Sequence, residues 1–188
     1  LASWLPLKSS AQRFKLSLNP GAIGVQLSNE ALLEAAKEYG FQAIAPQLAE
    51  IESWSTGQLN DFKETMTRET ISWDAAGLPV EFRQSEDKFT ADYQKLRTIL
   101  PKLERLGIER MSTWIMPCHD DLNYEQNMEL HAARLRKTAH LLADHKIRLG
   151  LEYVGPLTLK QSKRYPFVSN LAEVKELISA IGAANVGV

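Results

Sequence analysis

The sequence has few of the features that mark several large classes of protein. Its single cysteine, Cys118, excludes an internal disulfide and any zinc site built from several cysteines. No apolar run approaches the roughly 20 residues of a membrane span, so we expect no membrane partner. With 22 Lys and Arg against 23 Asp and Glu, the net charge of -1 gives no electrostatic reason to expect nucleic acid as a partner. The 44% of hydrophobic residues is that of a globular chain with a real core.

The first residues form a segment of their own. The chain begins at Leu1 rather than Met, and we interpret residues 1–12 as a tail, either the edge of an expressed fragment or the remnant of a processed leader. We expect residues 13–188 to form one domain. The predicted location is the cytoplasm, or the periplasm or exterior if residues 1–12 remain from a leader.

Short apolar segments alternate with segments of helical periodicity along the rest of the chain. Strands are predicted at residues 14–18, 41–48, 70–73, 111–116, 148–154 and 185–188. Helices are predicted after Ser28, from Thr56, from Ser85 to Gly107, after Asn123 and from Asn170 to Ile181. Residues 75–80 and 158–165 are predicted loops. Pro101 is expected to kink or break the third helix.

The connections between the predicted strands are too long for hairpins, which favours right-handed crossovers and a parallel sheet. Such a sheet is either open and doubly wound or part of a barrel. The segment after the first strand, residues 19–24, does not match a Gly-rich phosphate loop. We therefore favour an α/β fold with a parallel TIM-type barrel. Because eight strands need roughly 200 to 250 residues, we expect it to be truncated after the start of the sixth strand.

Glu152 is the first candidate for a functional residue. In a strand over residues 148–154, Leu149 and Leu151 share one face and Glu152 points to the other. Glu152 also lies near the carboxyl end of this strand, where parallel α/β sheets carry their chemistry. The alternative is a carboxylate paired with a neighbouring Lys or Arg.

Four further residues are candidates for substrate binding. His119 ends the fourth strand. Trp114 shares a strand face with Ser112, and the ring of Trp114 is either a platform for a sugar or part of the core. Arg83 follows the third strand and binds either an anionic group or a nearby Glu. Asn19 ends the first strand and is suited to hydroxyl binding or to a turn.

Other residues with reactive side chains are assigned structural places. Cys118 beside His119 has no identifiable third group, so a thiol nucleophile is disfavoured. His131, His140 and His145 are interpreted as surface or interhelix residues of the helix after Asn123.

Three segments together resemble the xylose isomerase-like barrels. These are Ser17-Leu18-Asn19-Pro20-Gly21-Ala22-Ile23-Gly24, Leu78-Pro79-Val80-Glu81-Phe82-Arg83 and Gly150-Leu151-Glu152-Tyr153-Val154-Gly155-Pro156. This superfamily of sugar phosphate isomerases and epimerases also includes inosose dehydratases, ketose 3-epimerases, hydroxypyruvate isomerases and endonuclease IV. The resemblance implies that Glu152 binds a divalent metal ion (Mn, Co, Mg or Zn), with further ligands that lie beyond Val188.

The function implied by this resemblance is proton transfer on a sugar, sugar phosphate or keto-polyol through an enediolate, with Glu152 as base. A lyase or dehydratase of the same superfamily and a metal-free sugar-binding barrel are the alternatives. An endonuclease IV-like nuclease is disfavoured because residues 75–80 contain no His. Open sheet edges would need covering by a partner chain, which is compatible with a homo-oligomer.

Overall fold

The computed structural model describes residues 14–188, so the tail predicted at residues 1–12 lies outside the described residues. Seven strands lie parallel to their neighbours: β1 (Ser17–Leu18), β2 (Ala43–Ile44), β3 (Ser72–Trp73), β4 (Ala76–Gly77), β5 (Arg110–Ile115), β7 (Arg148–Tyr153) and β9 (Val186–Gly187). Each predicted strand region overlaps one of them. The predicted loop at residues 75–80 is wrong in part, because β4 pairs there with β5.

The order of these strands decides between the two architectures that the sequence left open. The hydrogen-bonded orders are β1-β2-β3 and β4-β5-β7-β9, and only Asp74 and Ala75 separate β3 from β4 along the chain. Among the seven parallel strands, the order in the sheets therefore follows the order in the sequence. A doubly wound sheet would reverse its order at a switch point, whereas a barrel keeps it. The part of the chain that the structure describes is a barrel-type α/β sheet, as predicted.

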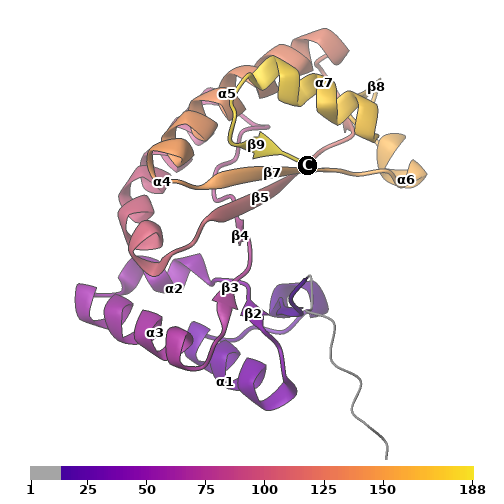
Figure 1. The fold of residues 1–188 in the computed structure, drawn as a ribbon. Helices are drawn as coiled ribbons and strands as arrows, with labels where there is room; N and C mark the ends of the chain where they lie inside the picture. The colour runs from indigo at the N-terminus through magenta and orange to yellow at the C-terminus, as the bar shows by residue number, and fades with distance from the viewer. Residues whose placement is uncertain (1–13) are drawn as a thin grey trace, which may run out of the picture.

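The helices form an outer layer around the strands (Figure 1). They are α1 (Asn29–Tyr39), α2 (Leu48–Ser53), α3 (Thr56–Arg68), α4 (Glu86–Leu106), α5 (Tyr124–Asp144), α6 (Leu157–Lys160) and α7 (Leu171–Ile181), with a short 3-10 helix η1 (Pro20–Ile23) after β1. The five long helices match the predictions. The short helices α2 and α6 occupy the end of the predicted strand at 41–48 and part of the predicted loop at 158–165. No helix within residues 14–188 is both long enough and apolar enough to cross a membrane.

The core lies between the outer face of the sheet and the helices. Met111 and Ile115 of β5, with Leu149 and Leu151 of β7, are at most 1% exposed and belong to one apolar cluster with residues of α4, α5 and α7. Strand alternation therefore sends the other side chains of β5 and β7 to the inner face. This places Glu152 on the inner side, as predicted.

The expected break at Pro101 does not occur, because α4 continues from Glu86 to Leu106. Pro101 is exposed, while Leu100 and Leu103 beside it are fully buried. Apolar packing on the inner face holds the helix together, and the carbonyl of Arg97 that the proline leaves without an N–H partner lies on an exposed turn.

A small antiparallel pair joins two loops at the carboxyl ends of the strands. β6 (Cys118–His119) pairs with β8 (Tyr165–Pro166), and the N–H of Phe167 donates to the carbonyl of Pro117. The segment after β5 is thereby tied to the segment after α6. This pair fixes the position of His119, and the sequence did not indicate it.

Candidate site at the carboxyl ends of the strands

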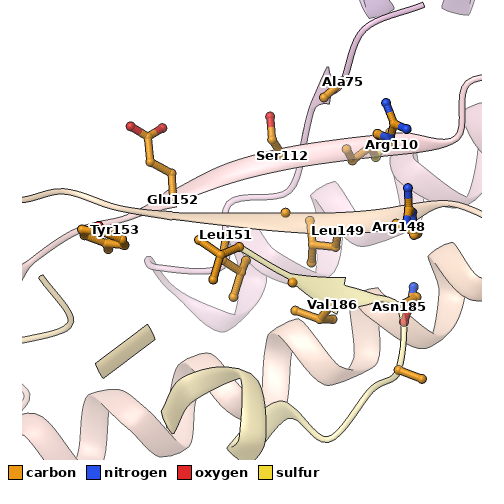
Figure 2. Close-up of a pocket in the computed structure, with 15 residues that line it drawn as sticks. Ala75, Arg110, Ser112, Arg148, Leu149, Leu151, Glu152, Tyr153, Asn185 and Val186 are labelled. Carbon is orange, nitrogen blue, oxygen red and sulfur yellow. The ribbon is translucent and has the colours of Figure 1, made fainter. Parts of the chain in front are cut away.

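Glu152 lies on the inner face near the carboxyl end of β7. Figure 2 shows its carboxylate pointing to the same side as Ser112, away from Leu149 and Leu151. Its side chain is exposed and makes no hydrogen bond or ion pair with any residue in the range 14–188, so the predicted alternative of a local ion pair is not formed there. An exposed carboxylate without a partner among these residues is free to bind a cation or to accept a proton.

Glu152 belongs to a hollow that we call the Glu152 hollow, lined by residues of β5, β7 and β9. Its volume is about 800 Å³ and its lining includes Arg110, Ser112, Arg148 and Gly187. Arg110 and Arg148 are direct partners in the β5–β7 register, at the opposite strand ends from Glu152. The hollow is therefore basic at one end and acidic at the other.

A divalent metal ion needs more ligands than this carboxylate. Residues 14–188 contain no group of three or more His, Cys, Asp or Glu side chains placed to hold a metal. Glu152 suits one oxygen ligand of a hard cation, but the donor set within the described residues does not complete a site. The predicted metal thus requires ligands from outside these residues.

Trp114 lies beside Glu152 and also lines a second pocket. The two residues are direct partners in the β5–β7 register, and the Trp114 side chain is 42% exposed. Trp114 is therefore not a core residue and its ring faces inward, while its predicted role as a platform for a sugar stays a prediction. One face of the indole is covered, because the guanidinium carbon of Arg83 lies 4.8 Å from its ring centroid.

Arg83 is held by an ion pair, which is one of its two predicted alternatives. Its Nε donates to Glu81 Oε1 over 2.8 Å and its Nη2 donates to Glu81 Oε2 over 3.0 Å, while Nη1 donates to the carbonyl of Trp114. Burial alone would raise the pKa of Glu81, but the hydrogen bonds from the Arg83 side chain and backbone outweigh it and lower that pKa. Arg83 therefore stands beside Trp114 with its charge already balanced.

The second pocket, which we call the Arg83 pocket, has a volume of about 260 Å³ and lies outside the carboxyl ends of β4 and β5. Its lining includes Arg83, Trp114, His119, Asn127 and His131. Nδ1 of His119 accepts hydrogen bonds from the N–H groups of Asp121 and Leu122, at 3.0 and 2.9 Å. A neutral His119 therefore carries its proton on Nε2.

The structure brings three of the four predicted binding residues together, namely Arg83, Trp114 and His119. It does not bring Asn19 to them. Asn19 is exposed before η1, beyond the first strand in the order, and lines neither the Glu152 hollow nor the Arg83 pocket. Its predicted role in binding stays a prediction without support from this geometry.

Sequence reasoning missed Asn127 and His131 of α5. The interpretation of His131 as a surface or interhelix residue is wrong. The residue is 1% exposed, and its ring packs between Phe82 and Phe167, with ring-centroid distances of 5.3 and 4.9 Å. Burial lowers the pKa of His131 to about 4. The available signal was the position of Asn127 and His131 on the same helical stripe as the buried Leu135 and Ala139.

The sequence matches no protein-family profile and no curated protein. Solved structures do match its fold. A xylose isomerase domain protein from Alicyclobacillus acidocaldarius has 29% sequence identity and a TM-score of 0.74, with 86% of this chain and 58% of that chain covered.

Two further structures share the fold at lower identity. The IOLI protein with a bound zinc atom has 16% identity and a TM-score of 0.72, covering 93% of this chain and 62% of that one. The probable 3-DHS dehydratase AsbF from Bacillus anthracis has 16% identity and a TM-score of 0.71, covering 92% of this chain and 61% of that one. D-psicose 3-epimerases solved with D-fructose or D-tagatose are also similar, at 16% and 13% identity. The chain thus spans about three fifths of the length of these proteins.

Proposed function

We propose that this chain takes part in proton transfer on a sugar or keto-polyol, as an isomerase or epimerase. The basis is its fold, which is that of the xylose isomerase-like barrel superfamily. The single observation that carries this proposal is the carboxylate of Glu152, which has no partner among residues 14–188 and lies on the inner face near the carboxyl end of β7. The similarity to D-psicose 3-epimerases solved with sugars supports the choice of substrate class.

Glu152 acts in this proposal as the general base. Its carboxylate removes the proton from the carbon next to the substrate carbonyl, which leaves an enediolate, and the resulting carboxylic acid exchanges this proton with solvent before it protonates the neighbouring carbon on the same face. Protonation of the other face, as in an epimerase, would need a second acid opposite Glu152. A divalent cation bound nearby would supply stabilisation of the enediolate oxygen. Trp114, as the direct neighbour of Glu152 on β5, offers an apolar surface against which a sugar ring or chain can lie.

The test is exchange of hydrogen at the reacting carbon. The complete gene product is incubated in D2O with D-fructose, D-tagatose or L-ribulose, with Mn²⁺, Co²⁺, Mg²⁺ or Zn²⁺ added in turn, and deuterium in the sugar is followed by NMR. We expect exchange in the parent protein and a loss of roughly 10³-fold or more in Glu152→Gln. Glu64→Gln, on the exposed face of α3, is the matched control. Exchange that survives Glu152→Gln would refute the proposal.

A lyase is the second candidate, and the similarity to the probable dehydratase AsbF favours it specifically. Elimination begins with the same removal of a proton next to a carbonyl, so Glu152 keeps its role. The products distinguish the two reactions, since an isomerase conserves the molecular formula and a dehydratase releases water. Mass spectrometry of the same reaction mixtures decides between them. Sugar binding measured by calorimetry without exchange in any mixture would favour a binding module instead.

A further inference from the structure

Two residues that line the Arg83 pocket each have a buried side-chain atom without a hydrogen-bond partner among residues 14–188. Asn127 and His131 lie one turn apart on α5, and each is 1% exposed. Neither Oδ1 of Asn127 nor Nε2 of His131 is hydrogen-bonded to any atom of residues 14–188. Most buried polar side-chain atoms in folded proteins are paired, and leaving one unpaired costs roughly 1–3 kcal/mol. Two such atoms on residues one turn apart indicate that something else donates to them.

The chemistry of this missing partner follows from the state of His131. Its Nδ1 lies 2.9 Å from the carbonyl oxygen of Asn127, and since a carbonyl only accepts, Nδ1 carries the hydrogen. Burial lowers the pKa of His131 to about 4, so the ring is neutral at pH 7. Nε2 is therefore a lone-pair acceptor, like Oδ1 of Asn127. Both atoms require a hydrogen-bond donor.

The charges around the pocket argue against an ionic partner. The guanidinium of Arg83 is paired with Glu81, and Nζ of Lys163 lies 3.0 Å from Oδ2 of Asp120. No phosphate or carboxylate would find an unpaired cation among these side chains. An ammonium group would find the carboxylate of Glu81 already occupied by Arg83. A neutral group with O–H donors fits the lining best.

The pocket also has a donor suited to the same kind of group. With Nδ1 of His119 accepting two backbone N–H groups, its Nε2–H remains to donate. The lining therefore combines acceptors on α5 with a donor on β6, and hydroxyl groups satisfy both. Trp114 borders the pocket and is also the direct strand neighbour of Glu152. A ligand whose reacting carbon faces Glu152 can thus extend across Trp114 into the pocket.

We propose that Asn127 and His131 accept hydrogen bonds from hydroxyl groups of an uncharged sugar, at the end of the molecule away from the reacting carbon. This inference rests on the proposed function and adds to it a substrate class, unphosphorylated sugars or polyols. Asn127 and His131 are binding and specificity residues, because they contact the substrate at a distance from its reacting atoms.

The first experiment observes His131 directly and needs no turnover. The Nε2 resonance of His131 is followed by ¹⁵N NMR in the Glu152→Gln protein during titration with D-tagatose and, separately, with D-tagatose 6-phosphate. We expect D-tagatose to shift this resonance in the direction of a newly accepted hydrogen bond, and the phosphorylated sugar to leave it unchanged at the same concentration. The resonance of the exposed His140 on the same helix is the internal control.

The second experiment separates binding from structure. In the complete gene product, Asn127→Leu and His131→Phe are expected to raise KM for the unphosphorylated sugar about 10- to 100-fold, with kcat within about threefold of the parent. His131→Gln, which keeps an acceptor, should recover part of this loss, while His140→Gln should change nothing. Thermal unfolding of each variant confirms that it is folded.

Three results would overturn the inference. They are a His131 resonance that does not move while calorimetry shows that D-tagatose binds, tighter binding of the 6-phosphate than of D-tagatose, or an internal water that bridges Asn127 and His131 and stays when sugar binds. The failure of the proposed function has a different signature. It would appear as hydrogen exchange that survives Glu152→Gln, whatever the His131 resonance does.

Discussion

At the scale of single residues, the ion pair between Glu81 and Arg83 is the main fixed charge next to the candidate site. Both side chains are about four-fifths buried, and two parallel N–H···O bonds join them. Because Arg83 also lies over the ring of Trp114, the pair positions the indole as well as balancing charge.

Glu81→Gln should therefore lower the unfolding free energy by about 1–2 kcal/mol at pH 7. Since the folded-state pKa of Glu81 is lowered, the stability that it contributes is present above its unfolded value of 4.5 and is lost as the pH falls through the folded pKa. The difference between parent and variant should accordingly shrink below pH 4.5. Urea unfolding at pH 7 and at acidic pH measures it, and a constant difference would contradict the assignment.

His131 gives a second pH dependence of known direction. Its folded pKa of about 4 lies below the unfolded value of 6.5, so the unfolded chain binds more protons in between and stability falls as the pH drops from 6.5 to 4. At about 1.4 kcal/mol per pH unit, the loss reaches roughly 3 kcal/mol. His131→Phe should remove this slope, as measured by unfolding free energies across that range. The exposed His140→Gln should retain it.

The orientation of Glu152 could be predicted from sequence because strand alternation is a strict local rule. The same rule turned Trp114 inward. Nothing local could predict the unpartnered atoms of Asn127 and His131, because hydrogen-bond satisfaction depends on which loops pack over the helix. A polar residue on an otherwise apolar helical stripe was the one signal present, and it indicates burial without indicating a ligand.

At the scale of secondary structure, α5 carries the new binding residues and begins with a well-formed cap. Oδ1 of Asn123 accepts from the N–H of Gln126, whose side chain accepts from the N–H of Asn123. The helix α3 begins in the same way with Ser55 and Gln58. The two caps therefore form a matched pair, one beside the Arg83 pocket and one remote from it.

Asn123→Ala and Ser55→Ala should each lower the unfolding free energy by about 1 kcal/mol. Only Asn123→Ala should also weaken sugar binding in calorimetry, because Asn127 lies one turn from the cap and would share in the fraying of the first turn. Equal effects of both variants on binding would show that the cap does not position the pocket.

Pro101 offers a separate test of how α4 is held. A proline in a helix interior is about 3 kcal/mol less favourable than alanine, and here it lies on the exposed face. Pro101→Ala restores an N–H for the carbonyl of Arg97, so we expect it to raise stability by about 1–3 kcal/mol, visible as a higher Tm. A lower Tm would mean that the helix depends on the local geometry of the proline.

The elements that the sequence predicted and those that it missed differ in length. The five long helices have both an apolar stripe and a capping residue, and each reinforces the other. The two-residue strand β4, between Asp74 and the turn-forming Pro79, has no periodicity to detect. Its existence depends on pairing with β5, which is a long-range contact.

At the scale of the whole molecule, the parallel strand order lines up side chains of like charge. Arg110 and Arg148 face each other at the amino ends of β5 and β7, and like charges at directly opposed positions repel. Neither is paired with an acidic side chain of residues 14–188. The arrangement gives the inner face an electrostatic gradient toward Glu152.

Arg148→Glu should convert this repulsion into attraction and raise the unfolding free energy of the chain by about 0.5 kcal/mol. The gain should shrink in 1 M NaCl, where the Debye length falls to about 3 Å. Arg97→Glu, an exposed change on α4, is the control for the change in net charge alone. A destabilised Arg148→Glu protein would mean that the two arginines are neutralised by groups outside the described residues.

The antiparallel pair of β6 and β8 bears on how such a protein could be re-engineered. The thiol of Cys118 donates to the carbonyl of Leu159, and the N–H of Phe167 donates to the carbonyl of Pro117. The segment after β5 and the segment after β7 are therefore held together as one rigid unit. A loop graft intended to change substrate range must therefore transplant both segments together. Exchanging only one of them would leave hydrogen-bond donors and acceptors of the other without partners. The recipient protein would then lose rigidity before it gained any new specificity.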